Sequence, residues 1–113
     1  MCSQATLNQI TSQVVSAVKN SLGNKLDKVI LYGSYARGDY DDESDIDIMV
    51  LADIPREDCW KEHLKISDLT WELDLEHDVL VSVHVTDCAT FYKFINDLPF
   101  YSNVLRDGVV LSA

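Results

Sequence analysis

The sequence predicts an α/β (α+β) fold in which helices pack on a small mixed sheet of about four strands. Three runs rich in apolar and β-branched residues, at 27–33, 45–52 and 78–86, predict strands, and residues 109–111 predict a short edge strand. Apolar residues spaced three and four apart, before and between these runs, predict helices. The 113 residues, 47% of them apolar, are expected to form a single domain over residues 1–113.

The first expected helix spans residues 4–22. Its apolar residues recur at steps of three and four and so share one face: Leu7, Ile10, Val14, Val15, Val18 and Leu22. Gly23 follows, and a glycine in this position commonly ends a helix. This helix is expected to pack on the sheet and to carry no chemistry.

The strand at 27–33 is almost continuously apolar, which is typical of a strand buried on both faces. A short helix is expected at 34–39. An acidic loop at 39–43, interpreted as solvated surface, then leads to the strand at 45–52.

A long helix is expected from about Pro55 to about His77, because proline suits a helix start. Large apolar side chains fall on one of its faces: Trp60, Leu64, Trp71 and Leu75. Such a face most often belongs to the core or to a partner surface rather than to a platform for a nucleotide base. If left uncovered, it would be a protein-docking site.

Valine occupies every second position from 79 to 85, which predicts the strand at 78–86. The opposite face of this strand would carry Asp78, Leu80, Ser82, His84 and Thr86. A helix is then expected from Asp87 or Thr90 to about Asn96. Pro99 precedes a helical turn over 100–105.

The chain carries 9 basic and 19 acidic residues, a formal net charge of −10. Nucleic-acid binding draws its affinity from lysine and arginine, so a direct nucleic-acid partner is not expected. The balance favours a basic protein partner, or a surface that simply stays soluble.

Three cysteines at positions 2, 59 and 88 lack the spacing of a disulfide framework or a zinc site, which favours a reducing cytoplasm. No signal-peptide pattern is present, and no apolar run approaches the roughly 18 residues of a membrane span. A cytoplasmic protein without a membrane partner is therefore expected.

Two aspartates alternate in the strand at 45–52. Residues two apart in a strand share a face and lie roughly 6.5–7 Å apart, so Asp45 and Asp47 are expected to point the same way. Mg²⁺ prefers carboxylates together with substrate phosphates, so this pair predicts a metal site. The alternative is a pair of solvent-facing aspartates on an edge strand.

Gly33 and Ser34 stand where a strand gives way to a short helix. A glycine lets the backbone approach a ligand closely, and the serine hydroxyl can donate to a phosphate oxygen. Backbone N–H groups at the helix start also favour an anion. A phosphate site and metal carboxylates facing one cleft would suit phosphoryl transfer.

Gly33-Ser34, ten intervening residues and Asp45-Ile46-Asp47 resemble the Gly-Ser-x10-Asp-x-Asp signature of the polymerase-beta-like nucleotidyltransferase superfamily. The resemblance implies the fold of that superfamily. It also implies that the two aspartates bind one or two Mg²⁺ ions.

Ala36-Arg37-Gly38 and Ser44 resemble the minimal nucleotidyltransferase (MNT) branch of that superfamily. By this resemblance the residues that bind the nucleotide are Gly33, Ser34, Arg37 and Ser44. Arg37 would neutralise a triphosphate, and a surface ion pair is its alternative role.

The resemblance implies a third carboxylate on a neighbouring strand. Asp78 is the candidate, so the catalytic and metal-binding set would be Asp45, Asp47 and Asp78. Related sequences often place this carboxylate where the chain has Leu80. The alternative is that Asp78 is a plain residue at the start of a strand.

The implied activity is a Mg²⁺-dependent transfer of AMP from ATP to an acceptor hydroxyl, with release of pyrophosphate. MNT proteins commonly act as antitoxins that adenylylate a tyrosine of a HEPN-type toxin, so ATP and such a toxin are the expected partners. Two alternatives stay open. One is a catalytically weak domain that neutralises its partner by binding alone. The other is a nucleotidyltransferase for small molecules of the aminoglycoside kind, for which a homo-oligomer would have to complete the acceptor pocket.

Overall fold

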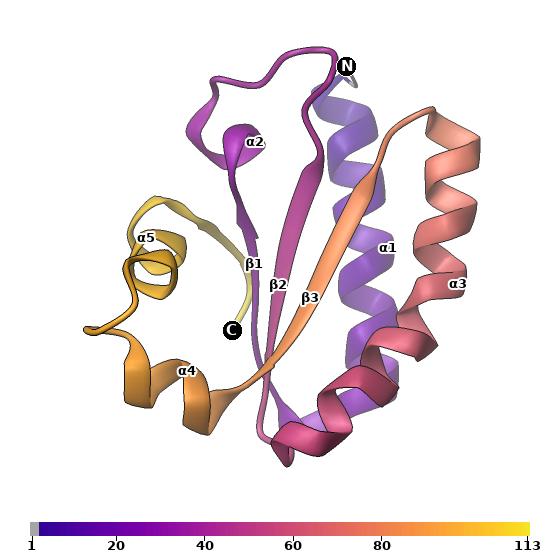
Figure 1. The fold of residues 1–113 in the computed structure, drawn as a ribbon. Coiled ribbons are helices and arrows are strands. Elements are labelled where there is room, and N and C mark those ends of the chain that lie inside the picture. The colour runs from indigo at the N-terminus through magenta and orange to yellow at the C-terminus, as the bar shows by residue number, and fades with distance from the viewer. Residues whose placement is uncertain (1–2) are drawn as a thin grey trace.

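The computed structural model describes residues 3–113 and contains a four-stranded sheet with five α-helices and two short 3₁₀ helices (Figure 1). In chain order the elements are α1 (Gln4–Leu22), η1 (Gly23–Lys25), β1 (Leu26–Tyr32), α2 (Ser34–Arg37), β2 (Ile46–Ala52), η2 (Arg56–Asp58), α3 (Cys59–His77), β3 (Val81–Asp87), α4 (Cys88–Phe94), α5 (Pro99–Asp107) and β4 (Val109–Ser112).

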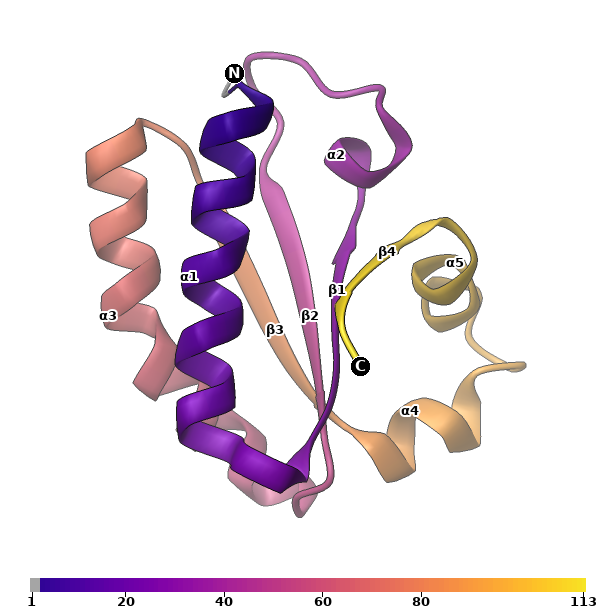
Figure 2. The same ribbon diagram turned by 180° about the vertical axis from the view of Figure 1, so that it is seen from behind.

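The strands lie in the order β3-β2-β1-β4, with β4 at one edge and β3 at the other. β2 and β3 are parallel, whereas β1 runs antiparallel to both β2 and β4. Figure 2 shows β4 beside β1 from behind. The predicted α/β class with a small mixed sheet is confirmed.

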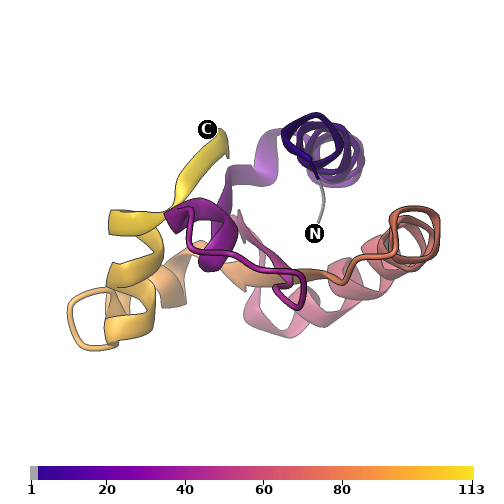
Figure 3. The same ribbon diagram turned by 90° about the horizontal axis from the view of Figure 1, so that it is seen from above.

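Helices cover both faces of the sheet, as the view from above shows (Figure 3). On one face, α1 and α3 bury a core cluster that includes Ile10, Val14, Ile48, Val50 and Leu73. On the other face, α4 and α5 bury a smaller cluster of Ile30, Met49, Leu51, Phe91 and Val104. This second cluster covers only part of that sheet face. Polar strand residues outside the cluster, such as Asp47 and Ser82, stay partly exposed.

Side-chain caps begin two of the predicted helices. The Thr6 N–H donates to the Ser3 hydroxyl at 3.1 Å, and Gly23 ends α1 with a φ of 57°, so the helix predicted at 4–22 is confirmed. The Thr90 N–H donates to the buried Asp87 carboxylate at 2.9 Å, which fixes the start of α4.

The third strand begins at Val81, so the prediction that it starts at residue 78 is wrong. Asp78 instead ends α3 in the left-handed conformation with a φ of 51°, and its N–H donates to the Asp74 carbonyl. The Asp74 carboxylate accepts from the Val81 N–H at 2.8 Å and ties the end of the helix to the start of the strand. The alternation of valines continues through this turn, which is why the pattern alone placed the strand start too early.

The tryptophans of α3 do not belong to the core. Ile66 and Leu73 are the buried residues of this helix, whereas Trp60 and Trp71 are both mostly exposed. The helix therefore carries a second apolar stripe on its outer side, and periodicity cannot say which stripe meets the sheet.

Within the described part of the chain, the helices are too short or too polar to traverse a bilayer. Cys59 and Cys88 are free thiols, and Cys2 lies outside the described residues.

Candidate active site

Asp47 lies near the start of β2, on the sheet face that α4 and α5 only partly cover. Strand register places Tyr32 of β1 on one side of it and Ser82 of β3 on the other. The side chain of Asp47 is half-buried. This carboxylate is thus held between two neighbouring strands rather than on a loop.

Gly33 packs against the Asp47 carboxylate. A Cβ at position 33 would collide with Asp47 Oδ2, and the φ of 77° at this position disfavours any residue with a side chain. The Gly33 carbonyl accepts from the N–H groups of Ala36 (3.2 Å) and Arg37 (3.1 Å), which starts the short helix α2. A glycine here lets the strand end approach the carboxylate.

A cavity of about 410 Å³ opens beside Asp47, within the size range of small-ligand sites. Its walls come from β1, α2, β2 and α5, and they consist of Tyr32, Gly33, Ser34, Arg37, Asp47, Phe100, Asn103, Val104 and Asp107. Four of the residues predicted from the sequence therefore meet in one cavity: Gly33, Ser34, Arg37 and Asp47.

The electrostatics of this site centre on Asp47. Burial and the nearby negative charge of Asp45 raise the pKa of Asp47, while His84 and Arg37 act in the opposite direction. Burial, together with the charge of Asp47, raises the pKa of Tyr32 to about 12. A carboxylate whose negative charge is disfavoured by burial and by a neighbouring carboxylate, with both groups offering hard oxygen donors, fits a divalent cation such as Mg²⁺.

The remaining predicted residues line a second cavity. Asp45, which immediately precedes β2, lines a smaller space of about 200 Å³ together with Ser44 and Asp78. The Ser44 hydroxyl accepts from the Asp41 N–H at 2.9 Å, so Ser44 shapes the acidic loop. Ser44, Asp45 and Asp78 therefore do not line the cavity that Asp47 lines, although the Asp45 charge still acts on Asp47.

The strand residue beside Asp47 on β3 is Ser82, and Leu80 lies exposed before that strand begins. The β3 position next to Asp47 thus carries a hydroxyl and not a third carboxylate. Among residues 3–113, no three His, Cys, Asp or Glu side chains are grouped closely enough to hold a metal ion. Asp45, Asp47 and Asp78 therefore do not form one compact three-ligand group.

Residues 12–111 match a protein family described as "Nucleotidyltransferase domain". The chain belongs to this nucleotidyltransferase family. It is 38% identical over 99 residues to "Putative protein adenylyltransferase MJ0604" of Methanocaldococcus jannaschii, an alignment that covers 88% of this chain and 91% of that protein. "Putative protein adenylyltransferase MJ0141" of the same organism is 36% identical over 93 residues, covering 82% of this chain and 92% of that protein.

Solved structures share the fold of this nucleotidyltransferase. The "putative nucleotidyltransferase from Sulfolobus solfataricus" has a TM-score of 0.61 at 22% identity and covers 96% of this chain and 87% of its own. A "putative minimal nucleotidyltransferase" has a TM-score of 0.54 at 19% identity, covering 91% and 93%. A toxin–antitoxin crystal structure with AMP-PNP has a TM-score of 0.53 at 22% identity, covering 89% and 72%.

Arg37 of the nucleotidyltransferase forms the surface ion pair considered from the sequence and also reaches the cavity wall. Its Nε donates to the Asp39 carboxylate at 3.3 Å, and its exposed side chain also lines the cavity at Asp47. Tyr35 is buried and stacks on Tyr40 with the ring centroids 4.3 Å apart, so Tyr35 packs inside the protein.

The wall contributed by α5 was not anticipated. Phe100, Asn103 and Asp107 face the cavity, and their spacing of three and four is that of one helix face. This spacing is visible in the sequence, but it does not say that the face meets β1 and β2. Tyr32, whose ring lies 5.7 Å from that of Phe100, was missed for the same reason.

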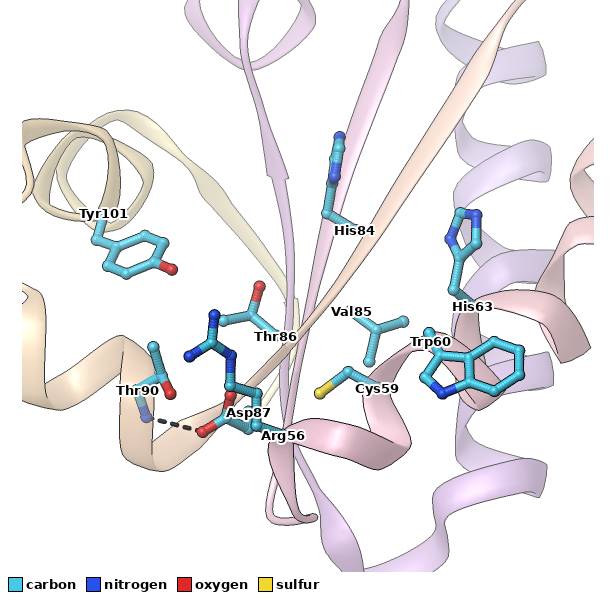
Figure 4. Close-up of a pocket in the computed structure, with 10 residues that line it drawn as sticks. All are labelled: Arg56, Cys59, Trp60, His63, His84, Val85, Thr86, Asp87, Thr90 and Tyr101. Atoms are coloured by element: carbon cyan, nitrogen blue, oxygen red, sulfur yellow. Dashed lines mark hydrogen bonds between the residues drawn. The ribbon is translucent and has the colours of Figure 1, made fainter.

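A hollow of about 430 Å³ lies along β3 at the edge of the sheet (Figure 4). Its walls come from η2, α3, β3, α4 and α5, and they consist of Arg56, Cys59, Trp60, His63, His84, Val85, Thr86, Asp87, Thr90 and Tyr101. His84 links the hollow to the active site, because its ring contributes to the electrostatics of Asp47 and lies 6.4 Å from the ring of Tyr32. The nucleotidyltransferase thus has a second hollow, which shares no lining residue with the cavity at Asp47.

Proposed function

We propose that this nucleotidyltransferase is a Mg²⁺-dependent protein adenylyltransferase that transfers AMP from ATP to a hydroxyl group of another protein in the cytoplasm. Its acceptor is a tyrosine of a HEPN-type toxin, and the chain is the antitoxin. The names of the curated relatives support the reaction, and the fold shared with a toxin–antitoxin protein supports the pairing. The observation that carries the proposal is the contact between Gly33 and the Asp47 carboxylate at the floor of a nucleotide-sized cavity.

In this proposal the triphosphate lies in the cavity at Asp47. Gly33 and Ser34 contact the β- and γ-phosphates, and the Arg37 guanidinium neutralises part of their charge. The exposed edge of Phe100 gives the nucleotide an apolar surface. Ser44 acts on the loop that positions Asp45 and not on the nucleotide itself.

Asp45 and Asp47 would hold Mg²⁺, since their carboxylates are neighbours and each offers the oxygen ligands that this ion prefers. When bound, the ion would neutralise phosphate charge and align the reacting oxygens. Asp47 is half-buried beside another carboxylate, and both facts disfavour its negative charge. A bound cation would therefore stabilise the ionised form of Asp47.

The acceptor approaches across the β3 edge of the sheet. Its hydroxyl oxygen bonds to the α-phosphorus, the bond from that phosphorus to the bridging oxygen breaks, and pyrophosphate leaves. We assign the hydroxyl proton to the Asp78 carboxylate, which shares a cavity with Asp45 near the start of β3. Positioning and charge neutralisation supply the catalysis, with no covalent enzyme intermediate.

The proposal is tested by incubating the chain with ATP, Mg²⁺ and a HEPN-type toxin. Intact-mass measurement should show the toxin heavier by whole AMP groups, and fragmentation should place them on tyrosine. The Asp45→Asn/Asp47→Asn double variant should give an unmodified toxin. An unmodified toxin with the native chain would refute adenylyl transfer to this class of partner.

A second candidate is a domain that neutralises its partner by binding alone. The observation that favours it is Leu80, an exposed apolar residue where related sequences often place the third carboxylate, together with Ser82, a hydroxyl residue, as the β3 partner of Asp47. An Asp45→Ala/Asp47→Ala double variant that still neutralises the toxin in cells would support this function over the enzymatic one.

A further inference from the structure

Four large apolar side chains form a stripe along the outer side of α3. Their exposed fractions are 59% for Trp60, 53% for Leu64, 65% for Trp71 and 69% for Leu75. Successive steps of four, seven and four residues at about 100° per residue keep all four on one side of the helix. We call this set the α3 stripe.

The α3 stripe is not needed to attach the helix to the sheet. Attachment uses the opposite side, where Ile66 and Leu73 are buried and the His63 ring lies 3.2 Å from the Val83 carbonyl. A surface helix normally needs one apolar side, and a contiguous exposed second one marks an interaction surface. Figures 1 and 3 show α3 at the outside of the molecule, beside α1 and away from α4 and α5.

The charged residues around the α3 stripe indicate which kind of partner surface it can bind. From residue 66 to residue 78 the sequence has no Lys or Arg, and it carries Asp68, Glu72, Asp74, Glu76 and Asp78. The two lysines of the helix, Lys61 and Lys65, already pair with Asp58 (3.6 Å) and Glu62 (3.0 Å). The negative end of the helix dipole lies at the same acidic end.

This charge distribution disfavours a second copy of the chain, since two surfaces of a protein with a net charge of −10 would repel each other. It favours a partner whose apolar residues are flanked by Lys or Arg. Such cations can also stack on the exposed indole of Trp71, which an acidic partner cannot do.

We propose that the α3 stripe docks a partner protein through an apolar helix flanked by Lys and Arg side chains. Trp60 belongs both to the stripe and to the wall of the hollow that contains His84. Figure 4 shows its indole on the side of the hollow away from Tyr101. A partner held on the stripe therefore lies beside the hollow that contains His84. That this hollow leads the partner toward the reacting groups is the one point that rests on the proposed function.

Both tryptophans of the chain lie in the stripe, so intrinsic fluorescence reports its occupancy directly. The probe is a synthetic helix of about 20 residues, matched in length to α3, with leucines on one side and Lys and Arg flanking them. Saturable binding should shift the tryptophan emission to shorter wavelength. A peptide with Glu in place of Lys and Arg should bind at least tenfold more weakly.

The test variant is Leu64→Ser/Leu75→Ser, which keeps both reporters and changes only exposed side chains. It should weaken binding of the basic peptide at least tenfold without lowering the melting temperature. The matched control is Phe94→Ser/Leu98→Ser, two exposed apolar residues outside the stripe, and it should bind as the native chain does.

Three results would overturn the proposal: no emission shift, equal loss of binding in the control variant, or equal binding of the acidic peptide. A fourth result would also overturn the proposal. If sedimentation showed that the native chain is a dimer and that Leu64→Ser/Leu75→Ser dissociates it, the stripe would bind a second copy of the chain. The binding experiment contains neither ATP nor Mg²⁺. Failure of adenylyl transfer therefore leaves the docking result standing, and failure of docking leaves the transfer assay unaffected.

Discussion

The backbone at Gly33 and the carboxylate of Asp47 occupy adjoining space, so that a methyl group at position 33 would overlap the carboxylate. The two residues come from β1 and β2 ends that the antiparallel pairing brings together, with Tyr32 opposite Asp47. The glycine and the aspartate of the sequence signature are thus two parts of one contact.

Gly33→Ala is expected to destabilise the fold, because it combines backbone strain with a collision. Gly23→Ala is the control, since Gly23 also has a positive φ of 57° but has open space where a Cβ would lie. Gly33→Ala should lower the free energy of unfolding by roughly 1–3 kcal/mol more than Gly23→Ala, measured by chemical denaturation. In the Gly33→Ala/Asp47→Ala double variant this excess should shrink, and an undiminished excess would contradict the collision.

Asp47→Asn is expected to stabilise the ligand-free protein at neutral pH while it abolishes transfer. Burial, and to a smaller extent Asp45, raises the pKa of Asp47 in the folded state. The protonated carboxyl therefore favours the folded state at low pH, and this stability is lost as the pH rises from the unfolded-state pKa through the folded-state pKa. The gain should stay below about 1 kcal/mol, since the half-exposed group is screened. It should disappear under acid, where the native carboxyl is protonated. A variant less stable than the native chain at neutral pH would contradict this account.

Tyr32 is expected to ionise only near pH 12. Burial raises its pKa, and the charge of Asp47 raises it further. The measurement is the phenolate absorbance as a function of pH, recorded for the native chain and for Tyr32→Phe. The difference between the two curves isolates Tyr32 and should show a transition at about pH 12. In Asp47→Asn the transition should move to lower pH but stay above the ordinary value, since burial remains. An unmoved transition would mean that Asp47 does not act on the phenol.

Arg37→Ala is expected to weaken ATP binding. Loss of one charge-assisted contact should raise the KM for ATP about tenfold with little change in kcat or stability, because the side chain is exposed and its partner Asp39 is also exposed. Lys61→Ala, which breaks a surface pair with Asp58, is the control and should leave the KM unchanged. A kcat loss without a KM change would place Arg37 in the chemical step instead of in binding.

Asp78→Asn is expected to leave stability unchanged, since asparagine also tolerates the left-handed conformation with a φ of 51°. If Asp78 accepts the hydroxyl proton, kcat should fall about 100-fold in the variant, measured in the transfer assay. Glu76→Gln, an exposed acid at the same end of α3, is the control. An unchanged kcat would remove Asp78 from the mechanism and leave the reaction to the residues around Asp47.

Much of the local structure followed from the sequence. The helix at 4–22 and the strands on either side of the acidic loop could be predicted because apolar spacing reflects which face of an element is buried. The sequence offered Asp87 or Thr90 as the start of α4, and the structure shows that the Asp87 side chain caps the helix. The turn at Asp78 could not be predicted, since its left-handed conformation leaves the valine alternation undisturbed.

The sequence by itself determined which elements form and that a glycine-serine step and two alternating aspartates flank one loop. The tertiary structure decided that β3 lies parallel to β2, which puts Ser82 beside Asp47, whereas Asp78 lies in the turn before the strand. It also decided that α5 walls the cavity and that the tryptophans of α3 face outward. The physical reason is that periodicity records the burial of each element along its own axis, whereas pairing between elements depends on contacts between residues far apart in the chain.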